Sequence, residues 1–158
     1  MAAEGGTWIE TETSACRFPD ERLRNRLRQL LGQIGGAMGE PIPFACQDWA
    51  GTKAAYRFFS NERISEDQIL AGHFAASRDR IAAASGPLLV AHDTTEFTYQ
   101  RGSTEAIGMT YRVNSGRDKA GRMRQHTVCG LLMHSSLALT AEGLPLGLAA
   151  VKGPPCAR

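Results

Sequence analysis

The stretch Pro87-Leu-Leu-Val-Ala-His-Asp-Thr-Thr95 marks a change of character in this 158-residue chain. The residues before it follow helical periodicity, whereas Leu88 to Ala91 form a short apolar run typical of a buried strand. Glycine and proline interrupt regular structure, so Gly86-Pro87 is expected to end the last helix before that strand. The sequence therefore predicts an α+β fold with its helices first and its strands second.

Three helices are expected before the strand. The first starts at Pro19 and ends at Gly35-Gly36, because five apolar residues recur on one of its faces. These residues are Leu23, Leu27, Leu30, Leu31 and Ile34. The second covers residues 43–59, with a break near Gly51. The third opens at Ser65–Gln68, whose spacing is that of a capping box.

The second half of the chain is expected to form a small sheet. Residues 100–125 are rich in glycine and arginine without periodicity, which predicts a long loop. Residues 126–140 and 144–152 are apolar and joined by a turn, which predicts a hairpin. No helix is expected after the hairpin to cover the sheet, and residues 153–158 are expected to form an unstructured tail. The chain therefore looks truncated.

Composition excludes several classes of protein. Apolar residues make up 42% of the chain and charged residues 22%, which is ordinary for a globular protein and excludes disordered, collagenous and coiled-coil chains. No apolar run approaches the roughly 18–20 residues that span a bilayer, and the N-terminus lacks the pattern of a signal peptide. A cytoplasmic protein without a membrane partner is expected. The four cysteines lack the spacing of zinc ligands and are expected to be buried free thiols.

The net charge of +2 hides two local basic regions. The first lies on the first predicted helix and consists of Arg22, Arg24, Arg26 and Arg28. The second lies within residues 101–124 and consists of Arg101, Arg112, Arg117, Lys119, Arg122 and Arg124. Arginines on an amphipathic helix are either solvated or contact DNA phosphates, and Lys53, Arg57 and Arg63 on the next helical segment would extend a phosphate-binding surface.

Asp93 is the most suggestive single residue of the second half. A carboxylate just beyond a buried strand is exposed yet held rigidly, which suits a divalent metal ligand. An aspartate after a strand is also a common turn residue, so both interpretations stay open. Glu96 is expected to be a solvated carboxylate that points to the opposite face from Asp93.

Several motifs together resemble a known family. The stretch Asp48-Trp-Ala-Gly-Thr-Lys-Ala-Ala-Tyr-Arg-Phe-Phe-Ser-Asn61 resembles the N-terminal DNA-binding module of insertion-sequence transposases, in the group that includes transposon Tn-five. The helix from Asp20 to Leu31, the segment Asp93–Thr95 and two later segments follow in the family's order. These later segments are His126-Thr-Val-Cys-Gly-Leu-Leu-Met-His-Ser135 and Glu142-Gly-Leu-Pro-Leu-Gly-Leu148.

The resemblance implies an enzyme of DNA transposition, a cut-and-paste form of DNA recombination, whose RNase H-like core holds Mg²⁺ ions with three carboxylates. Asp93 matches the first of them, as a catalytic residue and metal ligand, whereas the family's other two carboxylates lie beyond residue 152. The expected fold is a helical module followed by an incomplete RNase H-like mixed sheet. The expected domains are an arm at 1–16, a DNA-binding domain at 17–64, a linking helix with the first core strands at 65–152, and the tail.

Three functions remain open at this stage. The chain is either a truncated, catalytically inactive transposase fragment that binds double-stranded DNA at transposon ends, or a stand-alone regulator that inhibits a full-length transposase. A small metal-dependent nuclease centred on Asp93 is the third. The expected DNA contacts are Arg22, Arg26, Lys53 and Arg57, with a second region near the metal site made of Arg117, Lys119, Arg122 and Arg124.

Overall fold

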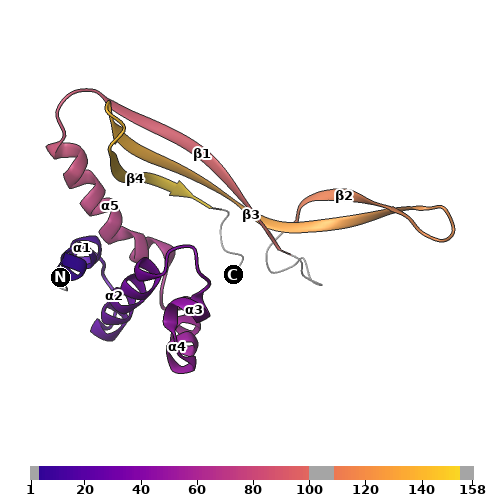
Figure 1. Ribbon diagram of the computed structural model, residues 1–158, viewed down its shortest axis with the longest axis horizontal. Coiled ribbons are helices and arrows are strands. Elements are labelled where there is room, and N and C mark those ends of the chain that lie inside the picture. The colour runs from indigo at the N-terminus through magenta and orange to yellow at the C-terminus, as the bar shows by residue number, and fades with distance from the viewer. Residues whose placement is uncertain (1–3, 100–108, 154–158) are drawn as a thin grey trace. The chain divides into compact units, whose positions relative to one another are not determined.

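The computed structural model describes residues 4–99 and 109–153 and divides the chain into two compact units, residues 1–85 and 86–158. We call them the helical unit and the sheet unit. The helical unit contains α1 (Glu4–Thr13), α2 (Glu21–Gly36), α3 (Ile42–Cys46), α4 (Trp49–Phe59) and α5 (Glu66–Ala83). The sheet unit contains β1 (Leu88–Tyr99), β2 (Met109–Arg117), β3 (Met123–Thr140) and β4 (Pro145–Lys152). The predicted α+β order is confirmed (Figure 1).

The helix ends follow from local capping chemistry. The side chain of Asp20 accepts a hydrogen bond from the amide of Arg22, so α2 begins two residues later than predicted. Ser65 and Gln68 form the predicted capping box at the start of α5, with both reciprocal hydrogen bonds present. The break between α3 and α4 falls at Gln47, which has a φ of 63°, rather than near Gly51.

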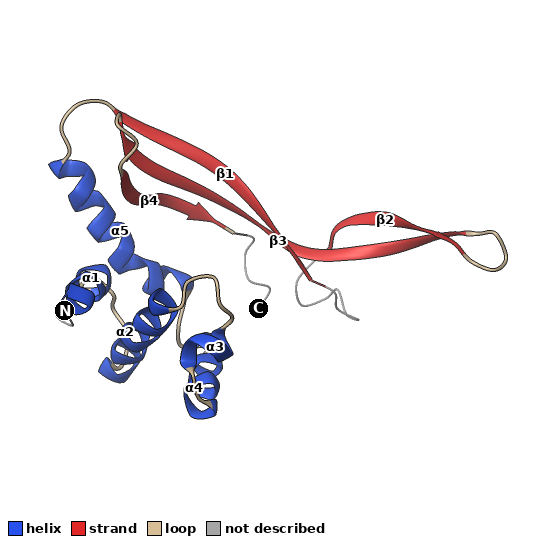
Figure 2. Cartoon of the chain, viewed as in Figure 1, coloured by secondary structure: helices blue, strands red, loops and turns tan. Residues whose placement is uncertain are grey.

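The core of the helical unit lies where α2, α3, α4 and the end of the α1–α2 connection meet (Figure 2). Six residues form its buried cluster: Cys16, Leu27, Leu30, Cys46, Ala55 and Phe58. Leu27 and Leu30 come from the predicted apolar stripe, whereas Leu23 and Leu31 pack against the cluster from its margin. Cys16 and Cys46 are free and buried, as expected. The side chain of Cys129 and all of Cys156 lie outside the described part of the chain.

Residues 4–13 correct the prediction of a flexible N-terminal arm, because they form α1. Thr13 is fully buried and its hydroxyl donates to the carbonyl of Ile9 at 2.7 Å, while Arg28 of α2 donates to Thr13 at 3.1 Å. The contact of Thr13 with Arg28 is tertiary, and the weakly amphipathic sequence of α1 has no periodic pattern that would predict a helix.

Helix α5 also packs within the helical unit, although the sequence assigned it to the catalytic part. A carboxylate of α1, Glu12, accepts from Arg80 at 2.7 Å and is 2.6 Å from His73 Nδ1, both on α5. Gly72 faces the same turn of α1 so closely that a Cβ there would lie 2.0 Å from the carbonyl oxygen of Glu12. Only a residue without a side chain allows this approach.

The sheet is built around the long central strand β3. β1 pairs with residues 129–140 of β3 along one edge. On the other edge β2 pairs with residues 123–129 and β4 with residues 134–139. All three described pairings are antiparallel, so the parallel part of the expected mixed sheet is absent from the described strands. The predicted hairpin of 126–140 and 144–152 is confirmed as β3 and β4.

The predicted long loop at 100–125 is wrong over residues 109–117 and 123–125, which belong to β2 and β3. The pairing of β1 with β3 ends at Cys129. β2 and the part of β3 that precedes Cys129 continue as a two-stranded ribbon past this end of β1, as Figure 1 shows. Residues 100–108 of the predicted loop and residues 154–158 of the predicted tail lie outside the described residues.

Candidate nucleic-acid interface

The arginines of α2 fall into two groups. Arg24 is bound to Glu21 at 2.9 Å, and Arg28 donates to Thr13 at the α1–α2 contact. Arg22 is exposed, and Arg26 donates only to the neutral amide oxygen of Gln29 at 2.9 Å. Among the described residues, neither Arg22 nor Arg26 has a carboxylate partner. Because they are four residues apart, these two cations lie on one face of the helix.

Helix α4 presents a second basic face. Its buried face carries Thr52, Ala55 and Phe58, whereas Lys53 and Arg57 are exposed and also four residues apart. The helix is fixed at its start by Asp48, whose carboxylate accepts from the amide of Gly51. No acidic side chain of the described residues pairs with Lys53 or Arg57.

An open groove of about 320 Å³ lies between α2 and α4. It is lined by Arg22, Leu23, Arg26, Ala54, Arg57, Phe58 and Asn61, and we call it the basic groove. Three guanidinium groups and one amide surround an apolar floor, with no carboxylate in the lining. Guanidinium groups match the geometry and charge of phosphate, so this arrangement suits an anion such as the nucleic-acid backbone.

The basic groove unites three of the four DNA-contacting residues predicted on the helices. Lys53 lies on the exposed face of α4 and does not line the groove. The sequence did not single out Asn61, which lies two residues after the end of α4 and lines the groove. A second hollow near Ser14 and Phe18 contains the carboxylates of Asp20 and Glu21 and is therefore less suited to an anion.

The aromatic side chains of α4 are divided between the core and the surface. Phe58 is buried and makes edge-to-face contacts with Phe18 and Phe59, with ring centroids 6.2 and 5.4 Å apart. Tyr56 and Phe59 are half exposed, and Trp49 is 79% exposed. The exposed face of α4 therefore carries aromatic rings beside its cations.

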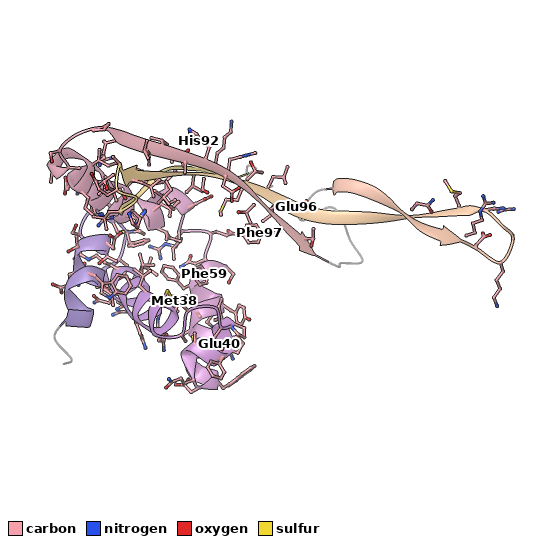
Figure 3. The ribbon with its side chains drawn as sticks, turned by 45° about the horizontal axis from the view of Figure 1, so that its top comes forward. Met38, Glu40, Phe59, His92, Glu96 and Phe97 are labelled. Atoms are coloured by element: carbon pink, nitrogen blue, oxygen red, sulfur yellow. The ribbon has the colours of Figure 1, made fainter. Side chains whose placement is uncertain are left out.

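Asp93 lies in the middle of β1 rather than just beyond a buried strand. It pairs in register with Ser135 of β3, and the side chain is exposed. Strand alternation places Glu96 on the opposite face, as expected, together with His92 (Figure 3). On that face His92 Nδ1 is 2.8 Å from the hydroxyl of Ser136.

The described residues do not assemble a metal centre around Asp93. Among the side chains that the structure describes, no group of three or more His, Cys, Asp or Glu residues has the arrangement of metal ligands. Mg²⁺ is held by oxygen ligands in near-octahedral geometry, and the active sites that use two ions need several carboxylates. Asp93 offers one carboxylate, so this stretch of chain does not by itself fit the expected ions.

The second basic region lies at the end of the β2–β3 hairpin. Arg117, Lys119 and Arg122 are exposed there, and the side chain of Arg124 lies outside the described part. The prediction placed this region near Asp93, and the register of the sheet contradicts that. Met123 is opposite Arg117 at the tip, whereas Ser135 is opposite Asp93, twelve positions further along β3.

Comparison with known proteins assigns a class to the helical unit. Residues 6–64, which include most of α1 and all of α2, α3 and α4, match the family model described as transposase DNA-binding. The match supports a transposase family for the chain and a DNA-binding role for this unit. No curated protein matches the chain. None of the helices that the structure describes is long and apolar enough to cross a membrane.

Proposed function

We propose that the helical unit binds the double-stranded DNA of transposon ends and that the chain serves DNA transposition. The observation that carries this proposal is the basic groove, where Arg22, Arg26 and Arg57 converge without a neutralising carboxylate. The proposal is supported by the position of the groove, which lies within the residues that match the transposase DNA-binding family. Lys53, on the neighbouring exposed face of α4, would add a further phosphate contact.

The proposed role of the sheet unit is the first part of an RNase H-like core. In this proposal Asp93 would be one of three carboxylates that hold Mg²⁺, and the described residues provide no further ligands beside it. DNA cleavage would need the complete set of carboxylates, because bound Mg²⁺ would supply the charge stabilisation that phosphate chemistry requires. The 158 residues alone would therefore bind DNA without cutting it.

A regulatory role is the second candidate, and one observation favours it. The buried cluster of the helical unit is made entirely of its own residues, from Cys16 to Phe58, so this unit has the core that DNA binding requires without a catalytic domain. Such a protein would occupy transposon ends and exclude a full-length transposase. Adding the chain to a transposition reaction of the full-length enzyme would then lower the yield of transposition product. A variant without the arginines of the basic groove would leave that yield unchanged.

The test of DNA binding removes the charges of the groove. The variant carries three substitutions, Arg22→Gln, Arg26→Gln and Arg57→Gln. It should bind a duplex with the sequence of a transposon end more weakly than the parent protein does. The slope of log K against log salt should fall by about 2.7, at roughly 0.9 per phosphate contact. The matched control replaces Arg63 and Arg78, two exposed arginines outside the groove, and should leave most of that slope in place. Equal slopes for the groove variant and the parent protein would refute the interface.

A further inference from the structure

The tip of the β2–β3 hairpin is a turn organised by one carboxylate. Asp118 Oδ1 accepts hydrogen bonds from the amides of Ala120 and Arg122, both at 2.9 Å. The backbone closes the same turn, because Gly121 N donates to the carbonyl of Asp118 at 3.0 Å and Asp118 N donates to that of Arg122 at 2.9 Å. Gly121 has a φ of 78°, which favours glycine. These bonds hold the turn in one conformation.

The same turn displays three exposed cations, Arg117, Lys119 and Arg122, which with Asp118 we call the basic tip. The carboxylate of Asp118 is engaged with backbone amides, and no described carboxylate forms an ion pair with any of the three. Arg117 Nη1 donates to the carbonyl of Gly121 at 3.2 Å, which ties this guanidinium to the turn. Lys119 and Arg122 keep their charges free for a partner.

The basic tip is far from Asp93 within the sheet unit. Twelve positions of β3 separate Met123 from Ser135, and at about 3.3 Å per residue of strand this is about 40 Å. Among the described strands, the segment of β3 that precedes Cys129 pairs only with β2, so the tip ends a two-stranded ribbon (Figure 3). The distance corresponds to about 12 base pairs of duplex at 3.4 Å each.

We propose that the β2–β3 hairpin is a DNA-contacting arm, with Lys119 and Arg122 on the phosphate backbone about 12 base pairs from the duplex segment that meets Asp93. Duplex DNA fits because the tip has a net positive charge, and because backbone contacts need cations rather than shaped pockets. Asp118 and Arg117 are positioning residues that hold the turn. The inference rests on the proposed DNA-binding function and adds a second site to it.

The contribution of the arm is affinity rather than sequence selectivity. Lysine binds phosphate as a flexible point charge, and contacts to phosphate carry no direct sequence information. Removing the two cations should therefore weaken binding to an end duplex and to a scrambled duplex by the same factor. This behaviour would separate the arm from any element that reads base edges in a groove.

The experiment uses the full chain and an end duplex. Lys119→Gln with Arg122→Gln should reduce the salt slope by about 1.8, at roughly 0.9 per contact, and abolish one segment of protection in a hydroxyl-radical footprint. The protection that depends on the basic groove should remain. The control replaces Lys152 and Arg63, two exposed cations outside the groove and the tip, and should keep the complete footprint.

A second variant separates positioning from charge. Asp118→Ala removes a negative charge, so charge attraction alone predicts tighter binding. If Asp118 positions the cations, the same variant should instead weaken protection of the arm's DNA segment, because the amides of Ala120 and Arg122 lose their acceptor. Tighter binding with full protection would overturn the positioning role.

The remaining outcomes are distinct from a failure of the proposed function. An unchanged footprint and slope in the Lys119/Arg122 variant, with the parent protein bound normally, would overturn the arm and leave the groove intact. A change of oligomeric state with an unchanged footprint would assign the tip to a contact between protein copies and would also overturn it. No binding by the parent protein would refute DNA binding itself, and the arm with it.

Discussion

The two units differ in where their apolar side chains lie. In the helical unit Leu30 is 1% exposed at the centre of a cluster formed by residues of that unit. In the sheet unit Leu89 and Val90 of β1 are 52% and 51% exposed, and no described residue of this unit belongs to a helix. The helical unit thus has the core of an independent domain, whereas β1 of the sheet unit carries apolar side chains that are half exposed.

This difference bears on function. A DNA-binding surface needs cations fixed on a stable scaffold, and the helical unit provides that with its own core. A carboxylate that binds metal needs neighbours at defined positions, and the exposed strand that carries Asp93 lacks them among the described residues. The comparison therefore supports DNA recognition as the activity that this stretch of chain carries by itself.

The largest expected effect comes from opening the helical core. Leu30→Ala should lower the free energy of unfolding of the helical unit by about 2–5 kcal/mol, because it leaves a cavity in a closely packed site. Leu89→Ala, on an exposed strand, should change stability by about 0.5 kcal/mol or less. Denaturant titrations followed by circular dichroism would measure both. Equal effects of the two substitutions would contradict the assignment of the core to the helices.

The close approach of α1 and α5 gives the next effect. Gly72→Ala should destabilise the helical unit by about 1–3 kcal/mol, because its Cβ would overlap the backbone of Glu12 and force the helices apart. Gly36→Ala is the matched control, since a Cβ at Gly36 meets no atom within 4 Å. The control should be neutral or slightly stabilising in thermal melts. A neutral result for Gly72→Ala would show that α5 does not pack on α1 as described.

The ion pairs of the same contact should have a smaller effect. Glu12→Gln removes the charge that Arg80 and His73 share, and the expected loss is about 1 kcal/mol, because Arg80 is partly exposed and solvent screens the pair. A double-mutant cycle with Arg80→Gln would isolate the pairwise energy. A coupling energy of zero would mean that the close packing at Gly72, rather than charge, joins the two helices.

The smallest expected effect depends on pH. Burial raises the pKa of the Cys16 thiol, so the folded unit retains this proton more strongly than the unfolded chain does. The stability that comes from the neutral thiol is complete below the pKa of an unfolded thiol and is lost as the pH rises through the folded value. The free energy of unfolding should therefore fall more steeply on the alkaline side in the parent protein than in Cys16→Ala. Parallel curves would contradict the burial of this thiol.

Elements with local patterns could be predicted from the sequence, and elements that depend on tertiary contacts could not. The apolar stripe of α2 and the capping box at Ser65 were read correctly because both are set within a few residues. Helix α1 was missed because Thr13 and Glu12 find their partners on α2 and α5. β2 was missed although Met109 to Asn114 alternate between apolar and polar residues, because this short pattern stands among glycines and arginines that favoured a loop.

In the candidate site, too, local patterns could be predicted from the sequence and tertiary contacts could not. Helical spacing put Arg22 and Arg26 on one face, but nothing in the sequence indicated that Arg57 of another helix would complete a groove with them. The separation of the basic tip from Asp93 was also hidden, because the distance follows from the register of β3 and not from the order of residues. Sequence patterns identified the cations, and the packing determined which of them act together.

The most direct test of DNA recognition is a binding titration of the full chain against duplexes that carry the ends of its own element. A scrambled duplex of equal length is the control, and each is measured at two salt concentrations. The account predicts tighter binding to the end duplex and steep weakening of both complexes with salt, as expected for several phosphate contacts. Binding that is no tighter than to the scrambled duplex, or that is independent of salt, would contradict it.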